Sequence, residues 1–216
     1  MVKLKNTEGL SEDEINAKAN AKSEKRKAAR DRLLENKTVE KGLLIVHTGT
    51  GKGKSTAAFG LVTRAIGNDM KVGVIQFVKG KWETGERVVL EAFPDQVKIQ
   101  TMGEGFTWET RDRARDIEAA NGAWDMAKAM IEDARENGAY DLILLDEINI
   151  CLRYDYLDIE DVVKTLSARP DMLHVIATGR NAKPELIEAA DLVTEMTLVK
   201  HPFREQNVRA QKGIEF

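Results

Sequence analysis

The chain has 216 residues and a formal net charge of −3, from 33 Lys and Arg residues against 36 Asp and Glu residues. Its length suits one α/β domain, and the near balance of charge argues against nucleic acid as a main partner, because phosphate backbones select clearly basic surfaces. The single cysteine, Cys151, excludes an intrachain disulfide framework and favours a cytoplasmic setting, and without a long apolar run we expect neither a membrane span nor a secretory signal.

The N-terminal 40 residues read as a helical extension with a positive net charge. Ser11 and Glu14 have the spacing of a capping box at the start of a helix. The stretch that follows is rich in Ala, Lys, Arg and Glu and offers only Ile15, Leu33 and Leu34 as sizeable apolar anchors. Such a helix has little to bury. Two interpretations stay open: a solvated extension without function, or a mobile cover over an active site.

A phosphate-binding loop is predicted where an apolar strand, a glycine-rich turn and a helix follow one another. The glycines let the backbone approach an anion closely, and the positive end of the helix faces the same space. Lys54 would neutralise phosphate oxygens, and the Ser55 hydroxyl would complete the coordination of Mg²⁺. The usual pattern has a further glycine where this chain has Thr48. A purely structural glycine turn is the alternative. The candidate phosphate-binding residues are Gly49, Thr50, Gly51, Lys52, Gly53, Lys54, Ser55 and Thr56.

Residues 41–216 alternate between strand and helix signals in the manner of βαβ units. Apolar runs such as residues 142–145 suit a parallel sheet that helices cover on both faces. We therefore predict a doubly wound α/β fold of about six mostly parallel strands, similar to phosphate-loop NTPases, with the ligand beyond the carboxyl ends of the strands. Strands are expected near residues 42–47, 71–77, 97–101, 142–146, 173–178 and 192–198, and helices near 54–66, 86–93, 111–137, 159–168 and 184–190.

Two aromatic residues, Phe106 and Trp108, lie two positions apart in a loop that also contains Gly103 and Gly105. Their rings could pack back on the domain. They could instead form a surface for a large, flat, apolar ligand.

A second polar site is predicted where the apolar strand after Asp141 ends in Asp146 and Glu147. In phosphate-loop proteins, an acid at this position lies beside Mg²⁺, opposite the Ser or Thr hydroxyl. Strand alternation sends the two side chains to different sides, so we expect one of them to contact the metal. Two polar residues where a strand meets solvent are the alternative. The nearby Cys151 is interpreted as a packed small residue rather than a nucleophile.

The phosphate loop at residues 49–60 resembles that of the ATP:corrinoid adenosyltransferases. The similarity covers residues 41–216 in order. Further segments that resemble this family are residues 75–80, 105–110, 145–147, 178–181, 190–196, 199–202 and 210–214.

The resemblance implies transfer of the 5′-deoxyadenosyl group of ATP to the cobalt of a reduced, Co(I) corrinoid, with release of tripolyphosphate, in adenosylcobalamin synthesis or salvage. It also implies Mg²⁺ as cofactor, ATP as co-substrate held in reversed orientation, a flavoprotein electron donor and a homodimer. Two alternatives are a phosphate-loop kinase or NTPase that acts at the γ-phosphate, and a corrinoid- or nucleotide-binding carrier without turnover.

By the same resemblance, Lys54, Phe106 and Trp108 are the catalytic residues. The two aromatics would crowd the lower face of the corrinoid, leave cobalt four-coordinate and so ease its reduction to Co(I). Residues 49–56 would bind the triphosphate, and Ser55 and Glu147 would hold Mg²⁺. Arg64 and Arg180 match positions that contact the nucleotide. Arg64 could instead be an ordinary surface arginine.

Overall fold

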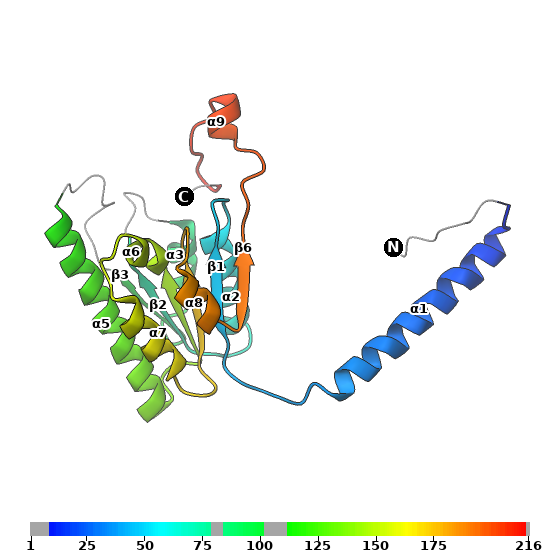
Figure 1. Cartoon of the computed structure of the whole chain (residues 1–216), viewed down its shortest axis with the longest axis horizontal. Coiled ribbons are helices and arrows are strands. Elements are labelled where there is room, and N and C mark those ends of the chain that lie inside the picture. Colours follow the sequence, from blue (N-terminus) through cyan, green and yellow to red (C-terminus); the bar gives the residue numbers. More distant parts are fainter. Residues whose placement is uncertain (1–8, 79–83, 102–111, 215–216) are drawn as a thin grey trace. The chain divides into compact units, whose positions relative to one another are not determined.

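The computed structural model describes residues 9–78, 84–101 and 112–214, and the chain divides into two units, Met1–Glu40 and Lys41–Phe216. The first unit contains one helix, α1 (Glu12–Glu35), shown in Figure 1. The capping box is present, because the Ser11 side chain accepts from the Glu14 backbone N–H and the Glu14 side chain accepts from the Ser11 N–H. No residue of α1 is buried. The cover function stays a prediction.

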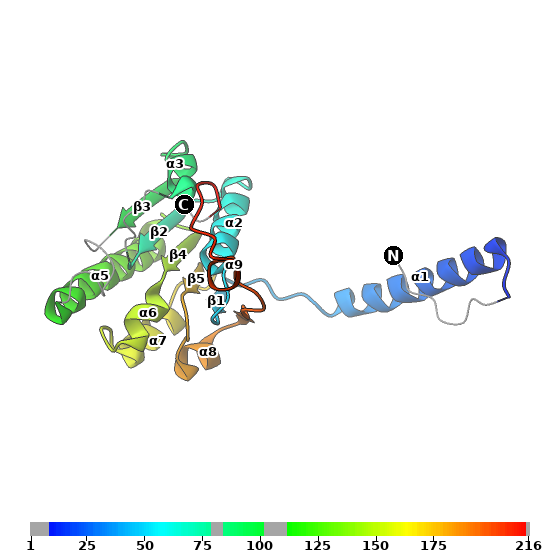
Figure 2. The same ribbon diagram turned by 90° about the horizontal axis from the view of Figure 1, so that it is seen from above.

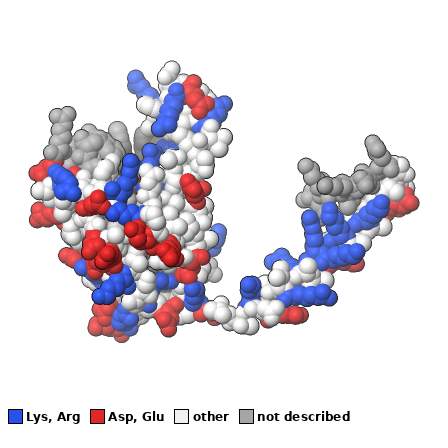
Figure 3. All heavy atoms as spheres, in the orientation of Figure 1, with Lys and Arg blue, Asp and Glu red and all other residues white. Residues whose placement is uncertain are grey.

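Lys and Arg side chains predominate along the middle and last turns of α1, as Figure 3 shows. The acidic residues Glu12, Asp13 and Glu14 occupy its first turn, where they favour the positive end of the helix dipole. Hydrogen bonds within the helix and this charge arrangement therefore carry its local stability. The basic residues are Lys18, Lys22, Lys25, Arg26, Lys27, Arg30 and Arg32.

The second unit is a doubly wound α/β fold around one six-stranded sheet with the order β3-β2-β4-β5-β1-β6, in which every pairing is parallel (Figure 1). The predicted fold class is confirmed. The strands are β1 (Leu44–Thr48), β2 (Val72–Gln76), β3 (Val97–Thr101), β4 (Leu142–Asp146), β5 (His174–Thr178) and β6 (Leu192–Glu195). The helices are α2 (Lys54–Ile66), α3 (Gly85–Leu90), α5 (Arg113–Asn137), α6 (Ile148–Arg153), α7 (Ile159–Ser167), α8 (Pro184–Ala189) and α9 (Pro202–Gln206).

Helices cover both faces of the sheet, with α2 and α3 on one face and α5, α6, α7 and α8 on the other (Figure 2). Successive strand residues point to opposite faces, so each central strand supplies apolar side chains to two cores. In β4, Ile143 and Leu145 pack toward α5 and its neighbours, while Leu142 and Leu144 pack toward α2. This two-sided burial explains why the strands read as continuous apolar runs.

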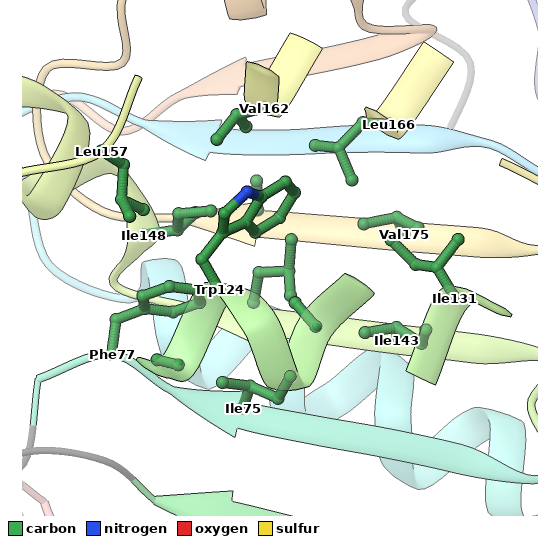
Figure 4. Packing of buried hydrophobic residues seen from close by; sticks show 14 of the residues in the cluster. Ile75, Phe77, Trp124, Ile131, Ile143, Ile148, Leu157, Val162, Leu166 and Val175 are labelled. Carbon is green, nitrogen blue, oxygen red and sulfur yellow. The ribbon is translucent and has the colours of Figure 1, made fainter. Parts of the chain in front are cut away.

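Trp124 of α5 fills the centre of the larger core, among Ile75, Phe77, Ile148 and Val162 (Figure 4). Its indole Nε1 donates a hydrogen bond to the Asp161 carboxylate at 2.7 Å, which satisfies the one polar atom of the ring.

Cys151 belongs to the same core, and burial raises the pKa of its thiol to about 12. A thiol in this environment stays protonated. The interpretation of Cys151 as a packed residue is confirmed.

The main differences from the sequence-based expectation concern β1, β6 and the short helices α6 and α9, neither of which was predicted. Strand β1 extends to Thr48, and α6 was not predicted because six residues give too short a periodic pattern. Strand β6 ends at Glu195, because the chain beyond it leaves the sheet edge and bonds to the loop after β1 through Met196. None of the helices in the described ranges is long and apolar enough to cross a membrane.

Candidate phosphate-binding site

The loop between β1 and α2 has the backbone of an anion-binding turn. Gly49 and Gly53 adopt left-handed conformations with φ of 94° and 97°. Gly53 is also the N-cap of α2 and makes no side-chain cap hydrogen bond. The first N–H groups of α2 therefore keep their bonding capacity for a ligand at the positive end of the helix.

The segment after β6 forms one wall of this loop. The Met196 N–H donates to the Thr48 carbonyl at 2.9 Å, and the Gly51 N–H donates to the Met196 carbonyl at 2.6 Å. A Cβ at Gly49 or Gly51 would lie 2.5 Å or 2.7 Å from the Met196 carbonyl oxygen. Both positions need glycine because another backbone approaches them so closely.

Lys54 begins α2 and folds back over the loop. Its Nζ donates to the Gly51 carbonyl at 2.5 Å, and the residue is buried. Burial lowers the pKa of the Lys54 ammonium below its ordinary value, and the positive charges of Arg180 and Lys52 act in the same direction, whereas Glu147 opposes them. An anionic ligand would relieve this crowding of positive charge.

Asp146, the last residue of β4, contacts the Ser55 side of the loop. Its carboxylate accepts a hydrogen bond from the Thr178 hydroxyl at 2.7 Å, and Ser55 and Gln76 also bond to it. Burial nevertheless raises the pKa of the Asp146 carboxyl, because these hydrogen bonds only partly offset the loss of water. The sequence analysis did not assign Asp146 to the metal site.

Glu147 follows the strand with φ of 65°, and its Oε2 atom is buried without a hydrogen-bond partner among the described residues. Burial and the neighbouring Asp146 raise the pKa of the Glu147 carboxyl to about 7, although Lys54 and Arg180 oppose that rise. Strand β4 ends at Asp146 and Glu147 is the left-handed N-cap of α6, so the alternation of side chains along a strand does not extend to Glu147.

These oxygen atoms fit Mg²⁺. The orphaned Glu147 Oε2 atom and the Ser55 hydroxyl are donors that Mg²⁺ accepts. Within the described ranges there is no group of three or more His, Cys, Asp or Glu residues that could hold a metal. In proteins, Mg²⁺ usually keeps several waters and binds through one or two protein ligands together with substrate phosphates.

Arg180 lies on a turn that begins at the end of β5. Gly179 has φ of 129°, its N–H donates to the His47 carbonyl at 3.2 Å, and its carbonyl accepts from the Asn149 amide at 3.1 Å. Asn149 is fully buried and also bonds to the His47 carbonyl at 3.5 Å. The Arg180 side chain is exposed. Its positive charge acts to lower the pKa of both the Lys54 ammonium and the Glu147 carboxyl.

Thr178 ties the acidic turn to the neighbouring strand. Its hydroxyl, which donates to Asp146, also accepts from the Glu147 N–H at 2.9 Å. Strand β5 lies between β1 and β4, so its end meets both the phosphate loop and the acidic turn. Thr178 and Asn149 were not predicted as site residues, because their partners are distant in sequence.

One of the remaining predicted site residues, Arg64, lies within the described structure. Arg64 is exposed in the last turn of α2, ten residues past Lys54, which corresponds to about 15 Å along the helix. Phe106 and Trp108 lie outside the described residues.

Comparison with known proteins gives consistent matches. A family model described as "ATP:corrinoid adenosyltransferase BtuR/CobO/CobP" matches residues 40–216. A corrinoid adenosyltransferase of Sinorhizobium sp is 55% identical over 197 residues, which cover 90% of each chain. One of Pseudomonas aeruginosa is 50% identical over 193 residues, 89% of this chain and 93% of that protein. One of Escherichia coli K12 is 48% identical over 177 residues, 82% of this chain and 87% of that protein.

Proposed function

Because the chain belongs to the ATP:corrinoid adenosyltransferase family, we propose that it transfers the 5′-deoxyadenosyl group of ATP to the cobalt of a Co(I) corrinoid. In this reaction the cobalt electron pair forms a bond to C5′ of ATP. The C5′–O bond breaks, and its electron pair leaves with tripolyphosphate. The protein must therefore hold three phosphates firmly while C5′ stays accessible.

The observation that carries this proposal is the collection of positive groups on the phosphate loop. Lys54 lies folded over the loop, and the charge of Arg180 reaches the same place. The N-terminus of α2, which begins at Lys54, has no side-chain cap. Negative charge grows on the tripolyphosphate as the C5′–O bond breaks, so cations fixed in advance at this position stabilise the transition state.

The acidic residues have a complementary function. Ser55 and Glu147 would hold Mg²⁺, and Asp146 would orient the Ser55 hydroxyl through the hydrogen bond between them. Bound Mg²⁺ would supply further positive charge against the phosphate oxygens. The unpartnered Oε2 atom of Glu147 supports this assignment.

We further propose functions for the two aromatic residues, an electron donor and a quaternary structure. Phe106 and Trp108 would displace the lower axial ligand of the corrinoid and so ease the reduction of Co(II) to Co(I). A flavoprotein would supply the electrons. The enzyme would be a cytoplasmic homodimer that works in adenosylcobalamin synthesis or salvage.

An anaerobic assay with ATP, Mg²⁺ and a chemically reduced corrinoid tests the proposal. We expect a light-sensitive alkyl–cobalt absorbance, with one tripolyphosphate released for each Co–C bond formed. Release of orthophosphate without Co–C formation would instead indicate a kinase or NTPase. Binding of ATP and corrinoid without either product would indicate a carrier.

A further inference from the structure

We propose that Thr48 is a positioning residue whose hydroxyl holds the Arg180 turn against the phosphate loop. This inference rests on the proposed function, in which Arg180 contacts ATP. Nothing in the phosphate-loop pattern assigns a function to a side chain at position 48, where the pattern has glycine.

The backbone explains why residue 48 does not need to be glycine. Thr48 is the last residue of β1 and pairs with Glu195 of β6 in the sheet. It is not among the residues with positive φ, whereas the next residue, Gly49, has φ of 94°. The left-handed turn therefore starts one position later than the pattern suggests. Position 48 is free to carry a side chain that does something else.

The Thr48 side chain bonds to the far end of the Arg180 turn. Its Oγ1 accepts a hydrogen bond from the Ala182 N–H at 2.9 Å, and Thr48 itself is 5% exposed. Asn181, between Arg180 and Ala182, adopts a left-handed conformation with φ of 54°. A residue in that conformation gains from being held by its neighbours, because it carries a local energetic cost.

The Arg180 turn is thus anchored at both ends. At its start, Gly179 bonds to His47 and Asn149, and at its end Ala182 bonds to Thr48. His47 and Thr48 are consecutive residues of the strand that leads into the phosphate loop. The backbone origin of the Arg180 side chain is therefore fixed relative to the phosphate loop.

Loss of the Thr48 hydroxyl would release one of these two anchors. The Ala182 N–H is partly buried and would lose its protein partner, so the turn could reach other conformations. Arg180 has an exposed side chain, and its position depends on where the turn places its backbone. Small displacements of a charged group cost much of its effect on a transition state.

The test compares Thr48→Val, which keeps the shape but removes the hydroxyl, with Thr48→Ser, which keeps the hydroxyl. Thr63→Val is the matched control, because the Thr63 hydroxyl donates to the Phe59 carbonyl within its own helix α2 and the residue is exposed. We expect Thr48→Val to lower kcat/KM for ATP by roughly tenfold. Thr48→Ser should keep a kcat/KM within about threefold of the wild-type value, and Thr63→Val should keep the wild-type value.

A double-mutant cycle with Arg180→Ala separates positioning from general damage. ATP affinity is measured by calorimetry, and the unfolding midpoint is recorded for each variant. If Thr48 acts through Arg180, Thr48→Val should weaken ATP binding in the protein that keeps Arg180. The same substitution should have little further effect in the Arg180→Ala protein. Thr48→Gly repeats the test if the valine variant folds poorly.

Equal losses from Thr48→Val in both backgrounds would overturn the inference, as would wild-type ATP affinity and turnover in a folded Thr48→Val protein. Wild-type ATP affinity in Arg180→Ala would overturn it as well. The cycle rests on ATP binding, so it remains informative if the wild type forms no alkyl–cobalt product. Absence of the alkyl–cobalt product would contradict the proposed function but not the positioning function of Thr48.

Discussion

Replacement of Glu147 by glutamine should stabilise the ligand-free protein at alkaline pH. The carboxyl has a pKa of about 7 in the folded protein against an ordinary value of 4.5, chiefly because it is buried, with Asp146 adding to the rise. The folded state thus holds this proton more tightly than the unfolded chain does. The contribution of the protonated Glu147 carboxyl to folding stability is fully present below pH 4.5. It falls as the pH rises toward 7 and is lost above that pH.

The size of the effect follows from the two pKa values. Ionisation of Glu147 costs the folded state about 1 kcal/mol at pH 5.5 and about 3 kcal/mol at pH 8. Glutamine has a similar shape and does not ionise, so it avoids this cost. The difference in unfolding free energy between Glu147→Gln and the wild type should therefore grow by about 2 kcal/mol between the two pH values.

Urea unfolding at pH 5.5 and pH 8 measures this difference, with Glu188→Gln on the exposed surface of α8 as the control. Saturating ATP and Mg²⁺ should reverse the order at pH 8, because the ligand stabilises the protein that binds it more tightly. The reasoning is refuted if the variant is no more stable than the wild type at pH 8, or if its advantage is the same at both pH values.

Further substitutions test other parts of the site. Lys54→Ala should lower the rate of adenosyl transfer at least about a hundredfold in a folded protein, because it removes the main cation facing the triphosphate; near-normal turnover would contradict the phosphate-loop assignment. Gly179→Ala should destabilise the protein by roughly 1–3 kcal/mol in thermal unfolding, because residue 179 has φ of 129° and the added Cβ would lie 2.8 Å from a buried side-chain carbon. Gly60→Ala, in open space on α2, is the control and should be neutral or stabilising. Phe106→Ala and Trp108→Ala should impair reaction from Co(II) far more than reaction from preformed Co(I), as followed by the alkyl–cobalt absorbance; equal losses would point to general binding damage.

The sheet and the phosphate loop could be predicted because their signals are local. The apolar run of β4 reflects burial on both faces, and the glycines beside Lys54 reflect one short turn. Both can be read from consecutive residues.

The contacts that hold the loops together could not be predicted, because they depend on the strand order. Thr178 meets Asp146, and Asn149 meets His47, only because β5 lies between β1 and β4. The left-handed conformation of Glu147, which follows the end of the strand, is likewise not marked in the sequence. A threonine in place of a motif glycine reads as a defect until its partner, Ala182, is known.

The place of β1 in the sheet has a consequence for synthesis on the ribosome. Strand β1 pairs only with β5 and β6, which are made more than a hundred residues later, and Gly51 bonds to Met196 near the end of the chain. At ordinary elongation rates, roughly 7–30 s separate the translation of the phosphate loop from that of Met196. The nascent loop therefore has neither its neighbouring strands nor its wall for most of translation. A chain that stops before β5 contains every glycine and the lysine of the motif, yet it cannot assemble the cradle that they form in the finished protein.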